Sequence, residues 1–527
     1  MAKYFNVTGL CIPQKHYMVE LSECIRQICI MVRRGDYFTI NRARQYGKTT
    51  TLAALAKALH PQHLVISLDF QALGSASFQN ENTFALAFLQ LFLREMSRHR
   101  ADEMPGMEAL AVAMRKTVGQ KDERYGLLAL FEDLLAVCAG SKKPVVLMID
   151  EVDSASNNQV FLDFLAQLRS YYLERDSKGT PIFQSVILAG VYDVKHLKKK
   201  LRLREEHMEN SPWNIAADFD VDMSLSESGI LDMLREYEKD HQTGMDTETI
   251  ANLLYAYTAG YPYLVSRLCK LIDEKLCGAW TREGFLEAVR ILLSEKNTLF
   301  ESLIGKLESD PQLKQMLWDL LFTGKTITYS IADQAVGMAL MFGFVKNVNG
   351  DVIPANRIFD TFLYDYFLSA GGAHGCEFYK ASIQDKNQFV GNGRLNMRLV
   401  LEKFGKHFRE LYGNCKTNFV EEEGRRYFLL YLRPIINGAG NYYIEARTRS
   451  FGRTDLIVDY GGEQFVVEIK IWRGNEYHSR GEKQLAGYLD DYGQNRGYLL
   501  SFNFNKKKQV GIFERRIDGK VLIEAVV

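Results

Sequence analysis

Residues 37–52 read YFTINRARQYGKTTTL, and this stretch decides the fold of the first part of the chain. A short run of β-favouring residues at 37–40 predicts a strand, and an Ala/Leu-rich pattern at 52–59 predicts a helix. The polar loop between them ends in the letters GKT. A strand, a polar loop ending in Gly-Lys-Thr and a helix form the layout of a phosphate-binding P-loop.

The residue types in this loop suit a nucleotide. Gly47 lets the backbone approach a phosphate closely, and the N-terminus of the following helix offers free N–H groups and the positive end of its dipole. Lys48 is expected to reach the β- and γ-phosphates, and the Thr49 hydroxyl is expected to bind Mg²⁺. The usual pattern also has a Gly where Arg42 stands here. Because GKT alone also occurs by chance, the prediction of ATP and Mg²⁺ depends on a second stretch.

That second stretch is residues 144–153, which read PVVLMIDEVD. Its apolar run predicts a strand buried on both faces of a parallel sheet, and the carboxylates that follow lie at the strand end where α/β sheets bind ligands. Asp150 is expected to hold Mg²⁺, directly or through water, and Glu151 to orient or activate the attacking water. The alternative is a strand that only ends in a polar turn, and the upstream GKT argues against it.

Further patterns predict the rest of an α/β core. Strand patterns occur at residues 63–70, 184–190 and 219–223. Helical periodicity occurs at residues 18–33, 83–98, 125–139 and 161–174. The charged stretch 100–123 is predicted to be a surface excursion. Strands that alternate with helices predict a parallel, three-layer αβα domain over residues 1–225.

Two features of this core have more than one interpretation. Tyr192 or Asp193, just beyond the strand pattern that ends in LAG, is a candidate sensor of the γ-phosphate. The aromatic residues Tyr4, Phe5 and Tyr17 precede the P-loop strand. They could stack on adenine, or they could simply pack their segment on the domain.

A helical lid and a small module are expected to follow the core. Residues 226–300 have helical patterns, broken at the letters GYP, where Pro262 can open the next helix. On that helix, Arg267 and Lys270 could reach the phosphates or lie on the surface. Residues 301–370 show two helical stretches, a hairpin with an Asn-Gly turn and another helix, which is the outline of a winged helix. Its second helix carries little positive charge, so packing is favoured over DNA reading.

A second chemical pattern lies in residues 442–472, YYIEARTRSFGRTDLIVDYGGEQFVVEIKIW. Two strands joined by a Gly-Gly turn carry Asp455 on the first and Glu468 and Lys470 on the second. The spacing puts Glu468 and Lys470 on one face. This is the arrangement of metal-dependent nucleases, in which Asp455 and Glu468 would bind Mg²⁺ and Lys470 would position water or stabilise developing charge. The alternative is a half-solvated strand with a Glu468–Lys470 ion pair.

Flanking residues extend this predicted site. The helix entered through the glutamates of residues 421–423 could add a third carboxylate, for which Glu422 is the predicted ligand. A downstream helix places Gln484 and Tyr488 on one face. Residues 376–527 hold more basic than acidic residues, which fits contact with the phosphate backbone of DNA or RNA. The basic residues near the predicted site are Arg447, Arg449, Arg453, Lys506, Lys507 and Lys508.

The composition is that of a multidomain globular protein. At 527 residues the chain is too long for one core, and its apolar and charged fractions of 47% and 25% are ordinary. The net charge is zero, so binding to nucleic acid would have to be local. The eight cysteines form no CxxC pair and indicate no zinc ribbon or disulfide framework. Without a signal-peptide pattern or a long apolar run, we expect a cytoplasmic protein with no membrane partner.

Together these motifs resemble a prokaryotic family that joins an N-terminal AAA-ATPase-like domain to a C-terminal PD-(D/E)XK nuclease domain. In that family an Arg-rich loop without the first Gly is usual, which implies Arg42, Arg44 and Thr50 as further nucleotide ligands. The resemblance covers nearly the whole chain. It is carried by NRARQYGKTT (41–50), VVLMIDEVD (145–153), NSPWNIAADFDV (210–221), GYP (260–262), GRTDLIV (452–458), VVEIKIW (466–472) and QLAGYL (484–489).

The resemblance implies a P-loop core of the ASCE type, a helical lid, a winged-helix-like module and a nuclease fold at residues 376–527. It implies catalytic roles for Asp455, Glu468 and Lys470, with Gln484 as a helper. The Pro of the family's Pro-Asp motif is a Thr in this chain. The biological task of the family is poorly defined, and conflict with mobile elements or phages is the usual suggestion.

We therefore predict an ATP-gated, Mg²⁺-dependent DNA endonuclease, in which the nucleotide state of residues 1–225 controls residues 376–527. One alternative is an NTPase switch whose nuclease-like domain only binds nucleic acid or a protein partner. Another is a regulatory module that binds nucleotide without turnover. A homo-oligomer is an open expectation, because an AAA-type ring needs an arginine finger in trans and the sequence assigns that role to no Arg.

Overall fold

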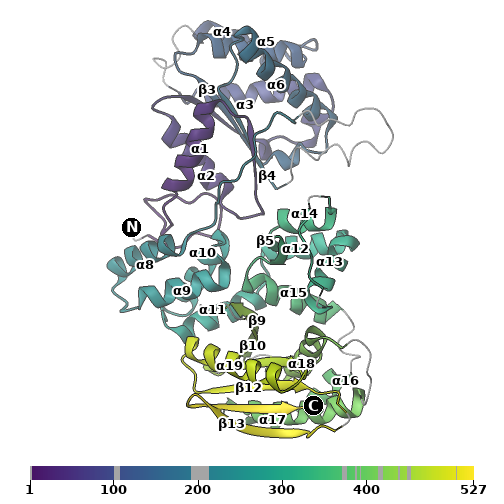
Figure 1. Cartoon of the computed structure of the whole chain (residues 1–527). Helices are drawn as coiled ribbons and strands as arrows, with labels where there is room; N and C mark the ends of the chain where they lie inside the picture. The colour runs from purple at the N-terminus through teal and green to yellow at the C-terminus, as the bar shows by residue number, and fades with distance from the viewer. Residues whose placement is uncertain are drawn as a thin grey trace. The chain divides into compact units, whose positions relative to one another are not determined.

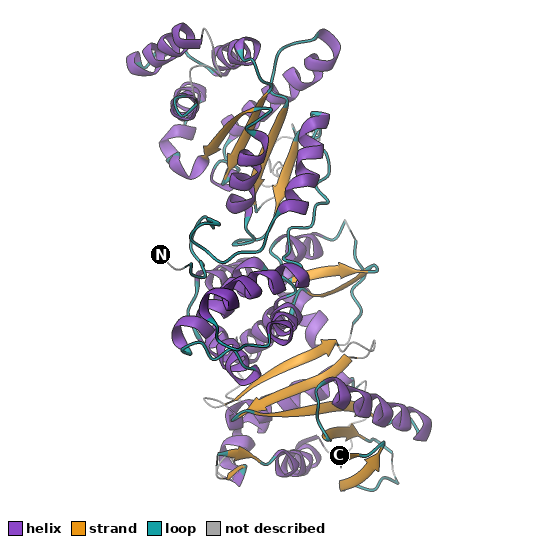
Figure 2. Ribbon diagram, turned by 90° about the vertical axis from the view of Figure 1, so that its left-hand side faces the viewer, coloured by secondary structure: helices purple, strands orange, loops and turns teal. Residues whose placement is uncertain are grey.

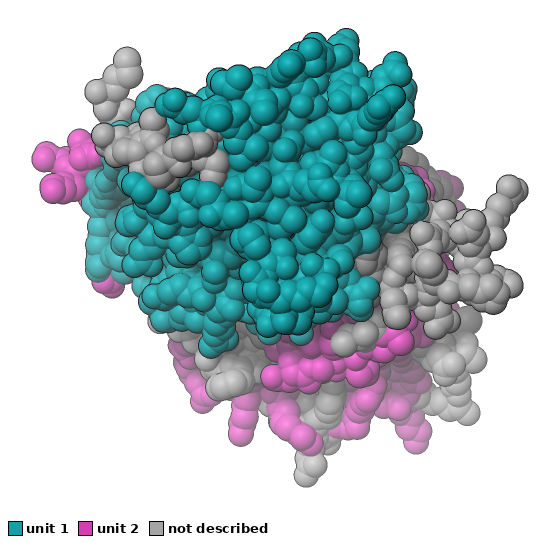
Figure 3. All heavy atoms as spheres, turned by 90° about the horizontal axis from the view of Figure 1, so that it is seen from above, with its two compact units in different colours: residues 1–237, 261–266 teal, residues 238–260, 267–527 magenta. Residues whose placement is uncertain are grey.

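The computed structural model describes residues 3–99, 107–191, 213–323, 325–330, 332–370, 377–385, 388–391, 393–412, 419–436, 440–447, 453–505 and 507–527. The chain divides into two compact units, which Figure 3 colours separately. Unit 1 comprises residues 1–237 and 261–266, and unit 2 comprises residues 238–260 and 267–527. Among the described residues, no helix is both long enough and apolar enough to span a membrane.

Unit 1 is built on a four-stranded parallel sheet with the strand order β1-β4-β3-β2. Its strands are β1 (Phe38–Asn41), β2 (Leu64–Asp69), β3 (Val145–Asp150) and β4 (Ser185–Gly190). Every residue of β3 and β4 is buried, because these central strands are covered on both faces. The parallel α/β core predicted from the apolar runs is therefore confirmed.

Helices cover both faces of this sheet and make three layers (Figures 1 and 2). On one face lie α1 (Ser22–Arg34) and α2 (Lys48–Leu59), and on the other lie α3 (Glu81–Met96), α5 (Leu127–Gly140) and α6 (Gln159–Lys178). Alternate residues of β3 serve the two cores, since Val146 and Met148 pack with the first pair and Leu147 and Ile149 with the other three. The last residues of β1, β2 and β3 are polar, namely Asn41, Asp69 and Asp150.

Two predictions about unit 1 are wrong. The stretch predicted as a surface excursion contains α4 (Met107–Gln120), because one apolar face suffices for a helix and its Met114 is 1% exposed in the core. Residues 219–223 do not form a strand. Among the described residues of this segment, only Ala217 makes a β-bridge, to Phe38. The apolar alternation of 219–223 reflects side chains that pack beside β1 without a hydrogen-bonded ladder.

The helical pattern predicted for residues 226–300 is present. It comprises α8 (Glu227–His241), α9 (Thr247–Thr258), α10 (Pro262–Lys270), the π-helical turn η6 (Leu271–Lys275), α11 (Arg282–Ser294) and the start of α12 (Thr298–Ser309). Ala259 and Gly260 have φ of 47° and 73°, and these left-handed residues end α9 before Pro262 opens α10. The first residues of α10 belong to unit 1, whereas α9 and α11 belong to unit 2.

A module of helices and one hairpin follows in unit 2. It comprises α13 (Pro311–Phe322), α14 (Gln334–Met341), β5 (Val345–Val348), β6 (Asp351–Pro354) and α15 (Arg357–Ala370). The hairpin turns at Asn349 and Gly350, whose φ values of 55° and 90° suit a type I′ turn. Val336 and Ala339 of α14 are fully buried, which agrees with the packing role favoured for this helix.

The C-terminal part of unit 2 contains a mixed six-stranded sheet with the order β13-β14-β12-β11-β10-β9. Its strands are β9 (Gly440–Arg447), β10 (Arg453–Tyr460), β11 (Glu463–Ile471), β12 (Arg496–Phe502), β13 (Gly511–Ile517) and β14 (Lys520–Val526). The predicted turn at Gly461 and Gly462 joins β10 to β11, with φ of 58° and 83°. The strands β11, β12 and β14 run parallel to one another.

Helices cover this second sheet as well (Figure 1). The helices of this part are α16 (Glu377–Asp385), α17 (Met397–Tyr412), α18 (Glu421–Ile436) and α19 (Asn475–Asp491), and a short hairpin of β7 (Val390–Gly391) and β8 (Arg394–Leu395) precedes α17. α19 packs on the face that carries Val466 and Leu499. α17 and α18 pack against Phe502, whose side chain points to the opposite face.

Candidate functional site

The P-loop of unit 1 is shaped by left-handed backbone. Gln45 and Gly47 have φ of 56° and 82°, and α2 begins immediately afterwards at Lys48. The Lys48 ammonium donates hydrogen bonds to the carbonyl oxygens of Arg42 and Ala43, at 3.0 and 3.1 Å. Burial lowers the pKa of Lys48, and neighbouring carboxylates oppose that shift. The buried lysine is thus folded back onto the carbonyl oxygens of its own loop.

The end of β3 meets the start of α2. The Thr49 hydroxyl donates a hydrogen bond of 2.6 Å to Oδ2 of Asp150. Oδ1 of Asp150 accepts a bond of 2.9 Å from the Glu151 N–H, and Glu151 has a left-handed φ of 55°. Burial, followed by the charge of Asp150, raises the pKa of Glu151. The hydroxyl and carboxylate oxygens brought together here are the donor types that Mg²⁺ prefers, so these residues fit that ion.

Three other predicted nucleotide ligands lie around the loop. The Arg42 guanidinium donates to the backbone oxygens of Asn41 and Val221, at 2.8 and 2.7 Å, and lies over the Phe219 ring. It therefore ties the loop to residues beside β1. Arg44 is exposed. The Thr50 hydroxyl accepts a hydrogen bond of 3.2 Å from the Cys11 N–H, which holds the N-terminal segment over α2.

Residues at the start of α10 contact the P-loop and were not predicted to do so. The Tyr261 hydroxyl donates to the Arg44 carbonyl oxygen, and its ring packs edge-on against Tyr46 with centroids 4.8 Å apart. A Cβ placed on Gly47 would meet Pro262 Cγ at 3.9 Å. The only sequence signal was the GYP motif itself, since proximity across such a distance in sequence depends on the tertiary fold.

Burial separates the alternatives for two of the three N-terminal aromatic residues, whereas Tyr4 is 45% exposed. Phe5 and Tyr17 are each 1% exposed, and both rings pack against Tyr237 with centroids 5.2 Å apart. This arrangement agrees with packing of the segment on the domain. The candidate γ-phosphate sensors, Tyr192 and Asp193, lie outside the described residues.

The second predicted site lies where β11 ends in unit 2. Glu468 is 0% exposed, and its Oε1 lies 3.0 Å from the ammonium of Lys470. The ammonium also lies 3.7 Å from Oε2 of Glu421, whose Oε1 accepts a hydrogen bond of 3.2 Å from the Ile471 N–H. Asp455 is on β10, the neighbouring strand, but its side chain lies outside the described residues. The structure thus brings together two predicted catalytic side chains and one additional carboxylate.

The glutamate of α18 that contacts Lys470 is Glu421, whereas the predicted third carboxylate is Glu422. Glu422 lines a cavity of about 190 Å³ together with Asp360, Tyr364 and Arg425. Successive residues of a helix point about 100° apart, so the phase of α18 decides which glutamate faces β11. The described residues contain no group of three or more His, Cys, Asp or Glu side chains that could hold a metal ion. Among the described residues, Glu421 and Glu468 are the carboxylates in contact with Lys470.

α19 covers the same face of the sheet. An added Cβ at Gly481 would meet Lys470 Cγ at 3.6 Å, which places the start of this helix beside the lysine. The side-chain amide of Gln484 donates to the Tyr488 hydroxyl, as expected for residues on one helical face. Lys508 donates to the Asn503 and Val527 carbonyl oxygens. Of the other predicted basic contacts, Arg449 and Lys506 and the side chains of Arg447 and Arg453 lie outside the described residues.

The two predicted lid cations are engaged in ion pairs. Arg267 donates to both carboxylate oxygens of Glu295, at 2.7 and 2.6 Å, and Lys270 lies 3.4 Å from Glu274. Neither contact involves the P-loop. A role for these cations at the phosphates stays a prediction.

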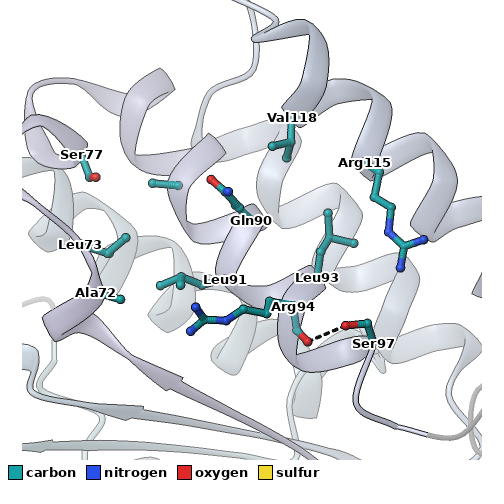
Figure 4. A pocket seen from close by; sticks show the side chains of 11 residues that line it. Ala72, Leu73, Ser77, Gln90, Leu91, Leu93, Arg94, Ser97, Arg115 and Val118 are labelled. Carbon is teal, nitrogen blue, oxygen red and sulfur yellow. Dashed lines mark hydrogen bonds between the residues drawn. The ribbon is translucent and has the colours of Figure 1, made fainter.

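An open cavity of about 540 Å³ lies elsewhere in unit 1 (Figure 4). Arg94 and Gln90 of α3 and Arg115 of α4 line it, together with apolar side chains such as Leu73 and Val118. No predicted phosphate ligand is among its lining residues. This cavity is therefore separate from the candidate nucleotide site.

Comparisons with solved structures find weak likenesses. The chain is similar to a Walker-type ATPase of Pyrococcus abyssi, with 10% identity, 68% of this chain and 99% of that chain covered, and a TM-score of 0.48. It is similar to the Aeropyrum pernix ORC1 protein in complex with DNA, with 13% identity, 67% and 94% covered, and a TM-score of 0.30. It is also similar to the Thermotoga maritima RuvB Holliday junction branch migration motor, with 13% identity, 64% of this chain and 92% of that chain covered, and a TM-score of 0.31. Likenesses of this size carry no argument about function.

The comparison with protein families assigns the chain to a family, which the solved structures do not do. No curated protein matches the chain. A family model described as an AAA-like domain matches residues 14–365, which is more than half of the 527 residues. The match begins before the P-loop strand and ends within α15. The chain therefore belongs to the AAA-like domain family.

Proposed function

We propose that unit 1 binds ATP and hydrolyses it with Mg²⁺. The observation that carries this proposal is the 2.6 Å hydrogen bond between the Thr49 hydroxyl and Asp150. It joins the loop helix to the central strand at the edge where parallel sheets bind ligands. Membership of the AAA-like domain family supports the same proposal.

Each residue of this site has a separate role. Lys48 and the free N–H groups of α2 bind the phosphates, because a charged acceptor forms a stronger hydrogen bond with the ammonium than the Arg42 and Ala43 carbonyl oxygens do. Glu151 orients the attacking water and accepts its proton, a role that its raised pKa favours. Thr49 and Asp150 hold Mg²⁺, which when bound neutralises charge on the phosphates.

Phosphate release from Mg-ATP by the full chain tests this proposal. Glu151→Gln is expected to keep ATP binding and to lower kcat by about 100-fold or more, since it removes the base. Lys48→Ala is expected to lose ATP binding. Lys57→Ala, an exposed cation further along the same helix, is the matched control and should behave as wild type. A wild-type chain that binds ATP but releases no phosphate, with or without DNA, would favour a regulatory module without turnover.

We also propose that unit 2 is a metal-dependent nuclease whose activity depends on the nucleotide state of unit 1. The supporting observation is the Glu468–Lys470 pair, with Glu468 fully buried on a central strand. Burying an ion pair costs desolvation free energy, so a purely structural strand would gain from apolar residues at these positions. Catalysis gives a reason for keeping the charges. Nucleotide-controlled cleavage would suit conflict with mobile elements or phages.

The residues of the proposed nuclease site have different roles. Glu468, Glu421 and Asp455 supply carboxylate oxygens for Mg²⁺, and Lys470 positions water or stabilises charge that develops on the phosphodiester. When bound, the ion supplies activation of water and stabilisation of negative charge. In this proposal Gln484, on the helix that covers Lys470, contacts the substrate backbone. The substrate is DNA or RNA.

Cleavage of plasmid and single-stranded substrates in Mg²⁺, with and without ATP, tests the nuclease. Asp455→Ala and Lys470→Ala are expected to abolish cleavage. Glu463→Gln is the matched control, because Glu463 lies on the same strand with its side chain on the other face. Cleavage that survives Asp455→Ala would contradict the proposal. Nucleic-acid binding without cleavage would favour an NTPase switch whose nuclease-like domain only binds.

A further inference from the structure

The carboxylate of Asp153 makes a contact that neither proposed reaction uses. Asp153 lies in the 3₁₀ turn η4 (Val152–Ser154), which follows Glu151. Its Oδ2 accepts a hydrogen bond of 2.7 Å from the N–H of Val191, the first residue after β4. β4 is the neighbour of β3 in the sheet. The turn that carries Glu151 is therefore fastened to the end of the adjacent strand.

Gly190 makes this approach possible. A Cβ on Gly190 would lie 2.8 Å from Asp153 Oδ1 and 2.9 Å from Val152 Cγ2, which is too close for any other residue without a shift. The Gly190 carbonyl oxygen accepts a hydrogen bond of 3.2 Å from the Arg42 N–H. The end of β4 thus links the turn after β3 on one side to the first residue of the P-loop on the other.

Asp153 also acts on Lys48 through its charge. Burial lowers the pKa of Lys48, and Asp153 is the residue that most opposes this shift, ahead of Glu151 and Asp150. The backbone of the turn is fixed as well, because the Ser156 N–H and hydroxyl donate to the Asp153 carbonyl oxygen at 3.3 and 2.8 Å. The side chain is thus fastened to the end of β4, and its charge supports that of the P-loop lysine.

We propose that Asp153 is a positioning residue for ATP hydrolysis, which holds the turn carrying Glu151 in register with the end of β4 and the P-loop. This inference rests on the proposed ATPase function. Asp153 acts through Glu151 and does not contact the nucleotide. Glu151 needs such support because its left-handed φ of 55° is a conformation that a non-glycine residue keeps only when its surroundings hold it.

The inference predicts that loss of the Asp153 side chain affects ATP hydrolysis much more than ATP binding. The backbone of α2 does not depend on the Asp153–Val191 bond, and the carboxylates of Glu151 and Asp150 continue to support the charge of Lys48 when Asp153 is replaced. ATP affinity should therefore largely survive the loss of this bond. The rate should not, because a displaced general base loses much of its effect even when the displacement is small. A residue that mattered only for folding would change the free energy of unfolding, but it would not lower kcat while leaving ATP affinity unchanged.

Steady-state hydrolysis and equilibrium ATP binding by the full chain test the inference. Asp153→Ala should lower kcat at least about tenfold while the Kd for Mg-ATP stays within about threefold of wild type. Asp153→Asn keeps an oxygen acceptor for the Val191 N–H and should recover most of the rate. Asp153→Glu keeps the charge but is too long for the contact with Gly190, so it should also lower kcat.

Asp69→Ala is the matched control. Asp69 ends β2, pairs in register with Asp150, and caps a 3₁₀ turn by accepting a 2.8 Å hydrogen bond from the Gln71 N–H. Its loss should leave kcat near wild type. The inference is overturned if Asp153→Ala and Asp153→Glu keep kcat within about twofold, or if they weaken ATP binding as much as turnover. A wild-type chain without hydrolysis would overturn the ATPase proposal and this inference together. An active wild type whose Asp153 variants behave in either of these two ways would overturn this inference alone.

Discussion

Asp459→Asn is expected to remove a pH dependence from the stability of unit 2. Asp459 lies on β10 and is 8% exposed, and its Oδ1 accepts a hydrogen bond of 2.9 Å from the Gln464 amide. Burial raises the pKa of Asp459 to about 7, although the Gln464 hydrogen bond and the guanidinium groups of Arg282 and Arg357 oppose that shift. Desolvation therefore outweighs two nearby cations.

The size of the effect follows from the two pKa values. The ordinary pKa is 3.8, and the folded value of about 7 is higher by roughly three units, which corresponds to about 4 kcal/mol. Because the folded pKa is raised, folding favours the protonated carboxyl. This stabilisation is fully present below the unfolded pKa and is lost as the pH rises through about 7. Asparagine cannot ionise, so the variant should match wild type near pH 4 and be up to about 4 kcal/mol more stable near pH 8.

Urea unfolding, read out by hydrogen exchange of peptides from residues 440–471, measures this free energy within unit 2. The series is run at several values between pH 4 and pH 8 on wild type, Asp459→Asn and Asp518→Asn. Asp518 is exposed between β13 and β14, so its variant controls for removal of one surface charge. Parallel curves for wild type and Asp459→Asn over this range would refute the reasoning, and so would a less stable Asp459→Asn at pH 8.

Three further outcomes are expected. Gly424→Ala should destabilise unit 2 by about 1–3 kcal/mol in urea unfolding, because its Cβ would lie 2.4 Å from a ring carbon of Phe502. Trp213→Phe should destabilise unit 1 by about 1–3 kcal/mol in the same assay, because it removes a buried 2.9 Å hydrogen bond to a hydroxyl on β1. Glu421→Gln should reduce Mg²⁺-dependent plasmid cleavage by about 100-fold or more, whereas Glu422→Gln should cleave at the wild-type rate. Equal losses of cleavage in the two variants would contradict the proposal that Glu421 is the third metal ligand.

The parts of the fold that could be predicted are those with a local signal. β3 and β4 were predicted because a strand buried on both faces must be apolar along its length. The P-loop was predicted because phosphate binding demands Gly, Lys and Thr in consecutive positions before a helix. The position of Asp150 and Glu151 at the C-terminal end of β3 was predicted because they come directly after the apolar run in the sequence. All of these arguments need only neighbouring residues.

The parts that could not be predicted depend on the phase or direction of single elements. The sequence 421–423 is a run of glutamates, and only the rotation of α18 places Glu421 rather than Glu422 beside Lys470. Arg42 was predicted to bind phosphate, but its guanidinium donates hydrogen bonds to the backbone carbonyl oxygens of Asn41 and Val221. Its role at the phosphates stays a prediction.

Segments with a mixed signal were misread for a related reason. Residues 219–223 alternate in polarity as a strand does, yet they pack on β1 through their side chains without a ladder. α4 was missed because the stretch 100–123 that contains it carries many charges outside the helix, although a single buried face is enough to hold a helix. The Asp153–Val191 bond had no sequence signal, because it joins the ends of two different strands.

The central claim is that unit 1 couples ATP binding at Lys48 to hydrolysis by Glu151. Its most direct test measures ATP binding and phosphate release on the same preparations of wild type, Lys48→Ala and Glu151→Gln. The account predicts binding with turnover in wild type, binding without turnover in Glu151→Gln, and neither in Lys48→Ala. Turnover by Glu151→Gln at the wild-type rate, or ATP binding by Lys48→Ala with wild-type affinity, would contradict it.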